Sequence, residues 1–353
     1  MTAATKREIA MTQSHSTVRR EVVKALAIGP YVTATGGIAS LLGSQDGLAQ
    51  QAPILLGSIS AEQPFSSMTG HYLQMLGGSR RLTQVSESSG VAGVGEITGP
   101  MGPSTLRFGK IDDPLNAKRK VFYFAAKRTD GVTFSHPGRV EIGIDQRAGA
   151  IQKKNVTYWM STEVLIGESR FAGGNGNLMQ VHNSTPLADV FGPFSITLVQ
   201  GVFPNRGVAV VRAASTQPIP SMPGFNQRVT YPWISNNPGF AGNPVTDNVT
   251  QTFGPYPIGQ WVKYVCKYRG DPDGTTGLLQ AWLTANGATT QIVNLNNIQI
   301  GTAALGFPTD YLKGGLDDYR LGGGIAGTWE LRRSLSLYLD NGNTEPQIRA
   351  LMP

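Results

Sequence analysis

The sequence predicts an all-β protein, a two-sheet antiparallel β-sandwich of the jelly-roll type. Many short segments alternate apolar and polar residues with a period of two, as strands that bury one face do. Turn-forming residues separate these segments, and the 353 residues include 44 Gly and 22 Pro. No helical run of apolar residues interrupts the series. Two packed sheets bury one face of many such strands.

Composition and charge limit the class of partner. Only 15% of the residues are charged, and a net charge of +7 with a pI near 9.5 suggests an anionic partner. The candidates are a nucleic acid, an anionic lipid and an anionic polysaccharide. Basic residues are dispersed, and the densest run is Lys118-Arg119-Lys120, so a nucleic-acid surface is not favoured. The single cysteine, Cys266, excludes an internal disulfide and a cysteine-based zinc site.

Residues 1–49 resemble an export signal of the twin-arginine type. The pair Arg19-Arg20 precedes a weakly apolar stretch from Ala25 to about Leu42, and Gly47-Leu48-Ala49 offers small residues to a signal peptidase. The alternative is a short amphipathic or anchoring helix. Three glycines and a proline in the apolar stretch disfavour a spanning helix. We expect a periplasmic or secreted mature chain that begins near Gln50, with no later membrane span.

The mature chain divides into two regions. Residues 50–103 are rich in Gly and Ser and weakly patterned, so we expect a loop-rich segment that packs on the sandwich, with Gly90–Pro103 as loop. Within this segment, His71–Leu76 is read as a strand or a helical turn. Residues 104–353 form the sandwich domain. Its expected strands are Thr105–Lys110, Lys120–Thr129, Arg139–Ile144, Tyr158–Ile166, Leu178–Asn183, Phe194–Val199, Val208–Val211, Gln260–Arg269, Leu278–Leu283, Tyr319–Ile325 and Ser334–Asn341.

The segment 216–259 interrupts this series. It lacks periodicity, is dense in Pro, Gly and Asn, and is too long for an ordinary connection. One interpretation is an insertion or lid loop over one end of the sheets, because such loops often border sites. A purely structural excursion is the equal alternative.

The strand Leu178–Asn183 carries the first candidate site residues. Residues two apart on a strand share a face, so Gln180 and His182 point the same way and two apolar residues point the other way. Of the three histidines after Gln50, only His182 lies on a well-patterned strand beside a polar neighbour. A solvated strand face is the alternative interpretation.

The strand Gln260–Arg269 has two distinct faces. Its apolar face, which includes Cys266, suits a core between two sheets, where a cysteine is a small buried hydrophobe. On a concave sheet the other face could bind acidic sugars, and a solvated face is again the alternative. The turn Asp271–Gly274 then leads into the next strand and lacks the remaining ligands of a calcium loop. The second face carries Trp261, Lys263, Lys267 and Arg269.

Several short motifs follow one another between about Ser104 and Asn341. They are Arg139-Val140-Glu141, Tyr158-Trp159, Gln180-Val181-His182, Gly259–Lys263, the Asp271–Gly274 hairpin, Trp282-Leu283, Leu321-Gly322 and Asp340-Asn341. In this order they resemble the jelly-roll, concanavalin A-like polysaccharide lyases of the heparin lyase I and glucuronan lyase group. More distantly, they resemble the sandwich-fold alginate lyases.

This resemblance implies β-elimination on a uronic-acid polymer. Neutralising the uronate carboxylate stabilises the enolate-like transition state, and a side chain then takes the C5 proton. By the resemblance, Arg139 and Gln180 would hold the carboxylate. His182 would act as the base or neutralise charge, and Glu141 would orient Arg139. The cationic strand would bind neighbouring uronates through Lys263, Lys267 and Arg269, with Trp261 beside them.

The proton donor of these lyases is usually a tyrosine that follows a Lys-x-Gly in the penultimate strand. The corresponding run here is taken as Arg320–Ile325, in which the tyrosine position falls on Gly324 or Ile325. Tyr319 is then the nearest candidate for the proton donor.

The expected function is an exported polysaccharide lyase that acts on an anionic polysaccharide as a monomer. We expect no cofactor, no nucleic-acid partner and no membrane contact after removal of the signal. The first alternative is a non-catalytic glycan-binding or surface protein on the same fold. A glycoside hydrolase ranks last because no strand offers the two flanking carboxylates that hydrolysis needs.

Overall fold

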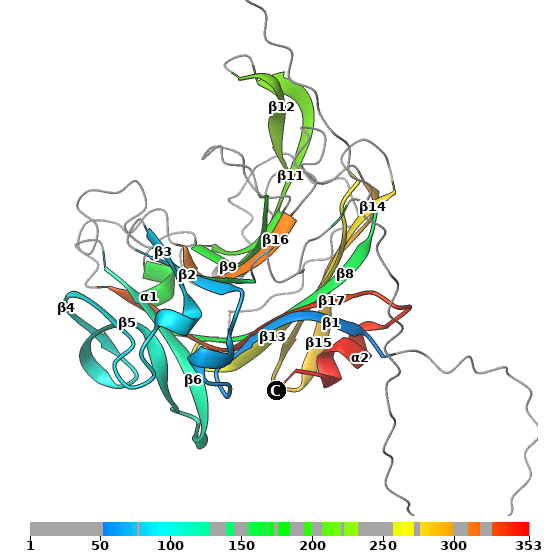
Figure 1. Ribbon diagram of the computed structural model, residues 1–353. Coiled ribbons are helices and arrows are strands. Elements are labelled where there is room, and N and C mark those ends of the chain that lie inside the picture. The colour runs from blue at the N-terminus through cyan, green and yellow to red at the C-terminus, as the bar shows by residue number, and fades with distance from the viewer. Residues whose placement is uncertain are drawn as a thin grey trace, which may run out of the picture. The chain divides into compact units, whose positions relative to one another are not determined.

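Two antiparallel sheets make up the described part of the chain, which confirms the predicted β-sandwich (Figure 1). All described residues lie in the compact unit Ala49–Pro353, so the expected export signal falls outside them. The computed structural model describes residues 52–75, 78–127, 139–144, 153, 155–167, 169–172, 176–183, 194–199, 207–219, 222–231, 257–271, 276–298, 310–317 and 327–352.

The larger sheet, sheet A, holds nine strands among the described residues, eight in a continuous path and β1 paired with β17. In path order they are β15 (Ala288–Ile298), β14 (Gly277–Ala285), β13 (Trp261–Arg269), β8 (Thr157–Ile166), β17 (Thr328–Leu339), β6 (Asn116–Ala126), β5 (Gly102–Asp113) and β4 (Val91–Gly99), with β1 (Ile54–Ser60) off the path.

The second sheet, sheet B, holds eight strands in the described ranges. In order they are β12 (Met222–Tyr231), β11 (Gly207–Ile219), β10 (Phe194–Val199), β9 (Gly176–Asn183), β16 (Asp310–Asp317), β7 (Arg139–Ile144), β2 (His71–Met75) and β3 (Gly78–Arg81).

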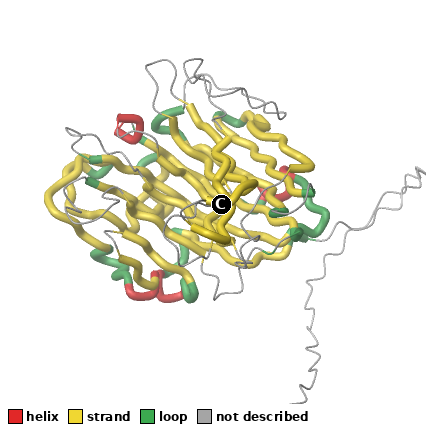
Figure 2. Tube along the Cα trace, turned by 90° about the horizontal axis from the view of Figure 1, so that it is seen from above, coloured by secondary structure: helices red, strands yellow, loops and turns green. Residues whose placement is uncertain are grey.

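Helices are few and short, as Figure 2 shows. They are α1 (Ser169–Ala172), α2 (Glu345–Ala350) and the 3-10 turns η1 (Phe65–Ser67) and η2 (Leu82–Gln84). The helix α2 packs against β13 and β8. No helix in the described ranges is long and apolar enough to cross a membrane.

Most expected strands are confirmed, one expected loop is wrong and two strands were not expected. Gly90–Pro103 is not a loop, because β4 and the start of β5 lie there. Strand β4 has few buried side chains, so its sequence does not show the alternating pattern of a strand. It forms because it pairs with β5. Residues 216–219 and 222–231 lie in the hairpin β11–β12, and the interpretation of 216–259 as an insertion or lid loop stays a prediction. Strands β15 and β16 were not expected, and Tyr319–Ile325 lies entirely outside the described residues.

The core lies between the two sheets and follows the predicted alternation on β13. Val262, Tyr264 and Cys266 are fully buried and Tyr268 is 1% exposed, so this face packs inward as expected. Sheet B contributes Val140 and other apolar residues of β7 and β9 to the same cluster. Side chains that alternate with these therefore point to the outer face of each sheet.

A β-bulge in β17 changes which residues of this strand face the core. The register against β8 shifts between Arg332 and Ser334, which leaves Arg333 as the extra residue. Before the bulge, Glu330 and Arg332 are fully buried, whereas after it Leu335 takes the inward position. The bulge thus allows Glu330 and Arg332 before it and Leu335 after it all to face the space between the sheets.

Cys266 provides a test of the core. Burial raises the pKa of its thiol, so the thiol stays protonated at a pH where an ordinary thiol ionises. We expect no reaction with a disulfide reagent at neutral pH in the folded protein, and one equivalent of reaction after denaturation. A Leu351→Cys variant, at a position that is 51% exposed, should react at once. Rapid labelling of native Cys266 would contradict the strand orientation.

Candidate functional site

The outer face of sheet B carries a row of polar side chains from adjacent strands. Gln180 of β9 pairs in register with Lys313 of β16, and Glu141 of β7 pairs with Gln74 of β2. Cross-strand partners point to the same face, so these side chains lie together. Arg139 precedes Glu141 by two residues on β7 and shares that face. We call these five residues the polar row.

Glu141 is the centre of the polar row. Gln180 Nε2 donates a hydrogen bond of 2.7 Å to Glu141 Oε1. Glu141 Oε2 lies 3.4 Å from Arg139 Nε and 3.5 Å from Lys313 Nζ. Lys313 Nζ also donates a hydrogen bond of 3.0 Å to Gln74 Oε1. One carboxylate therefore holds an amide and two cations from three strands in fixed positions.

Burial gives these contacts their weight. Glu141 is 1% exposed, Lys313 is 2% exposed and Gln180 is 6% exposed. Charges removed from water interact more strongly, and they need partners with good geometry. Two cations and one carboxylate give the row itself a formal charge of +1 (+2 − 1). This arrangement suits recognition of a ligand carboxylate.

Two glycines allow the strands to approach closely beneath the polar row. Gly315 has φ +140°, and a Cβ there would lie 2.4 Å from the carbonyl oxygen of Val140 and 2.8 Å from Cα of Glu141. A Cβ on Gly143 would lie 2.3 Å from the ring of Tyr72. A larger side chain at either position would displace the backbone or ring beside Glu141.

His182 occupies the next position along β9. Its Cα pairs in register with that of Tyr311, two residues from the Gln180–Lys313 pair on each strand. The structure describes the backbone at these two positions. A tyrosine position thus pairs in register with His182, a pairing that the sequence did not suggest. Tyr319, the expected proton donor, lies outside the described residues.

The run Arg320–Ile325, expected as the penultimate strand, lies outside the described residues. Among the described strands, β16 precedes the final strand β17, and it carries Lys313-Gly314-Gly315, which is itself a Lys-x-Gly. With the spacing used before, the tyrosine position falls on Asp317 or Asp318, and Tyr319 follows directly. The two glycines break the alternation of β16, so the sequence pattern did not predict a strand here.

The face of β13 with Trp261 and Lys263 lies on the outer side of sheet A, away from the polar row. Trp261 Nε1 donates to Asp113 Oδ1 at 3.3 Å, and Arg333 lies 4.1 Å above the Trp261 ring. Arg333 also bridges Asp113 and Glu163, at 2.8 and 2.7 Å. Burial raises the pKa of Glu163, an effect that Arg333 and Lys263 oppose. This cluster joins β5, β8, β13 and β17.

The rest of that face also contacts its own chain. Lys267 Nζ lies 3.2 Å from Asp340 Oδ2 and 4.7 Å from the centre of the Trp159 ring. Arg269 Nε donates a 2.7 Å hydrogen bond to the carbonyl oxygen of Thr276. The cationic strand and the polar row lie on opposite outer faces of the sandwich, so they do not line one groove.

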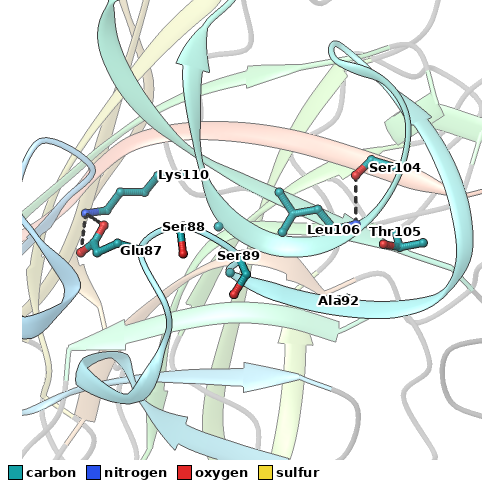
Figure 3. A pocket seen from close by; sticks show the side chains of 10 residues that line it. Glu87, Ser88, Ser89, Ala92, Ser104, Thr105, Leu106 and Lys110 are labelled. Atoms are coloured by element: carbon teal, nitrogen blue, oxygen red, sulfur yellow. Dashed lines mark hydrogen bonds and ion pairs between the residues drawn. The ribbon is translucent and has the colours of Figure 1, made fainter.

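A pocket of about 270 Å³ lies at the edge formed by β4 and β5 (Figure 3). Ser88, Ser89 and Thr105 are among its lining residues, and Glu87 Oε2 lies 2.9 Å from Lys110 Nζ beside them. No residue of the polar row lines this pocket. Within the described ranges, no group of three His, Cys, Asp or Glu side chains could hold a metal ion.

Comparison with solved structures gives similar folds among alginate lyases. The alginate lyase from Klebsiella pneumoniae is 12% identical, with a TM-score of 0.46, over 80% of this chain and 98% of that one. Alginate lyase A1-II', a member of polysaccharide lyase family 7, is 12% identical, with a TM-score of 0.42, over 77% and 96%. A variant of A1-II' in complex with product (GGG) is 13% identical, with a TM-score of 0.43, over 80% and 100%.

At these identities the likeness concerns the fold alone. It is to alginate lyases, the more distant of the two resemblances in the sequence, and nothing in it points specifically to the heparin lyase I or glucuronan lyase group. No family model and no curated protein matches the chain. Functional conclusions therefore rest on the residues of the chain itself.

Glu141→Gln tests the centre of the polar row. The substitution keeps the side-chain shape but removes the charge that Arg139 and Lys313 share. Breaking a buried ion pair leaves uncompensated charge, so we expect a loss of about 3–5 kcal/mol in the free energy of unfolding. Urea denaturation at constant pH measures this loss.

The matched control is Asp112→Asn, which removes a carboxylate paired with Lys120 at 2.6 Å on the surface, where the two side chains are 61% and 54% exposed. An exposed pair contributes less than about 1 kcal/mol. Equal losses in the two variants would show that Glu141 is not the centre of a buried network.

Proposed function

We propose that this chain is a polysaccharide lyase that cleaves a uronic-acid-containing glycan by β-elimination. The observation that carries the proposal is the polar row, in which buried Glu141 fixes Gln180, Arg139 and Lys313 on the outer face of sheet B. Cations and amides held in this way are the groups that would stabilise a uronate carboxylate as its C5 proton leaves. Preorganisation matters here because such groups need no reorganisation during the reaction.

The proposed roles follow from this arrangement. Arg139 and Gln180 neutralise the substrate carboxylate, and Glu141 orients Arg139 through their 3.4 Å ion pair. His182, one step along β9 from Gln180, is the base that removes the C5 proton. Tyr319, which follows the end of β16, returns a proton to the departing glycosidic oxygen.

We also propose substrate-binding roles away from the polar row. They belong to Lys263, Lys267, Arg269 and Trp261. On the outer face of sheet A they would contact a separate part of a long glycan chain or a second chain. We also propose that residues 1–49 direct export, which would place the mature protein where polysaccharides occur.

One observation favours a second candidate function, a non-catalytic glycan-binding protein. Asp317 or Asp318 stands at the tyrosine spacing after Lys313-Gly314-Gly315. A chain without a proton donor would keep the carboxylate-binding groups of the polar row and lose turnover.

The two functions differ in their products. A lyase leaves an unsaturated sugar that absorbs in the ultraviolet, so we expect rising absorbance when the protein acts on alginate, glucuronan or a heparin-type glycan. His182→Ala should lower the initial rate by about 10²-fold or more, since a general base contributes on that scale.

Lys120→Met, which removes an exposed cation 54% accessible in its side chain, should leave the rate unchanged. Undiminished activity in His182→Ala would refute the site assignment. Slower migration of the protein in affinity gels that contain these glycans, without any absorbance change, would favour the binding function.

The proton donor is tested by a pair of substitutions. We expect Tyr319→Phe to lower kcat by about 10²-fold or more with little change in KM, because only the proton transfer is lost. Tyr311→Phe, at the position that pairs in register with His182, should retain most of the activity. The reverse pattern in the same steady-state assay would assign the donor to Tyr311.

A further inference from the structure

Three charged side chains are buried together between the sheets, directly behind the polar row. Arg332 Nη2 lies 2.8 Å from Glu330 Oε1, and Arg170 Nε lies 3.3 Å from Glu330 Oε2. All three side chains are fully buried. They form an Arg–Glu–Arg triad, which we call the inter-sheet triad.

The inter-sheet triad joins sheet A to the two strands that carry Gln180 and Lys313. Arg332 Nη2 donates a hydrogen bond of 2.6 Å to the carbonyl oxygen of Leu178 on β9. Arg170 Nη2 donates a long one of 3.5 Å to the carbonyl oxygen of Gly315 on β16. Each acceptor lies two residues from a member of the polar row, so the triad holds both strands from behind.

The fit around Arg332 is close. Its Nη1 donates a hydrogen bond of 2.5 Å to Thr162 Oγ1 of β8, and its guanidinium lies 5.9 Å from the centre of the Phe124 ring. A Cβ on Gly314 would lie only 2.7 Å from Arg332 Nη1, so β16 can lie where it does because this residue is glycine. The backbone of β16 therefore packs directly against the guanidinium.

Such a triad is an expensive way to stabilise a fold. Desolvation of buried ions offsets most of their attraction, and packed apolar residues often replace a buried triad at no loss of stability. Geometry is what a planar guanidinium supplies better than an apolar side chain, because its fork fixes several acceptors at once. We therefore expect the triad to fix the positions of the strands that it contacts.

We propose that Arg332, with Glu330 and Arg170, positions β9 and β16 so that Gln180 and Lys313 meet Glu141 in the geometry the site needs. These are positioning residues, because they act from the core side and touch no substrate. The inference rests on the proposed function for its activity readout and on the strand contacts alone for its structural readout.

The central test is the triple variant Arg170→Met/Glu330→Leu/Arg332→Met. We expect its urea midpoint to match that of the unmodified protein, because apolar side chains replace the whole triad. Amide hydrogen exchange should quicken in peptides that cover 178–181 and 312–316 and stay unchanged at 158–164 of sheet A. On a cleavable uronate polymer, kcat should fall by about 10²-fold with a smaller change in KM, as misplaced groups cause.

Two further variants keep the test decisive if the triple variant fails to fold. Arg332→Lys keeps a cation beside Glu330 but lacks the fork that reaches Leu178 and Thr162, so exchange in 178–181 should still quicken. Arg333→Met removes the neighbouring arginine on the outer face and should leave sheet B exchange unchanged.

The outcomes separate the two proposals. Unchanged exchange in β9 and β16 in the triple variant, or in Arg332→Lys, would overturn the positioning role whatever the activity. A triple variant with full turnover would overturn it as well. Quickened exchange in a protein that turns over no uronate polymer even when unmodified would support the inter-sheet triad and refute the lyase.

Discussion

The bulge at Arg333 is the constraint on which the arrangement of both sheets depends. Arg332 points into the core and Arg333 points out, and the extra residue opposite β8 allows Leu335 to point into the core as well. The inward arginine joins Glu330 and reaches sheet B, and the outward one bridges Asp113 and Glu163 on the opposite face. Two consecutive arginines thus tie β17 to strands on both of its sides.

Buried charge recurs on the outer face of sheet B, where Glu141 plays the part that Glu330 plays inside. Each carboxylate holds two cations, one from its own strand and one from another strand or from a helix. Glu141 holds the side chain of Lys313 on the outer face of β16, and Arg170 donates from the core to the carbonyl oxygen of Gly315. Strand β16 is therefore fixed through its two faces, which explains how a strand with two adjacent glycines keeps a defined register.

Sequence reasoning predicted those strands whose own side chains match their burial. Arg139–Ile144 and Trp261–Arg269 alternate clearly, and the structure forms them as predicted. The alternating pattern did not predict the strands whose structure depends on their neighbours. Strand β16 forms where its glycines allow neighbouring groups to approach closely. In β17 the apolar pattern gives no sign of the bulge beside the buried Glu330. Lys313 was not predicted as a site residue because its strand has no clear alternation, although the sequence contains the Lys-x-Gly motif there.

The hydrogen bond between Gln180 and Glu141 could not be predicted from the sequence. Both were chosen from local motifs, but their 2.7 Å contact exists because β16 enters the sheet between β9 and β7 from far along the chain. That contact also bears on the class of chemistry. A glycoside hydrolase needs two carboxylates that flank its substrate, whereas the row holds one carboxylate, engaged by two cations and an amide. Such a carboxylate orients its neighbours, and those neighbours suit an anionic sugar.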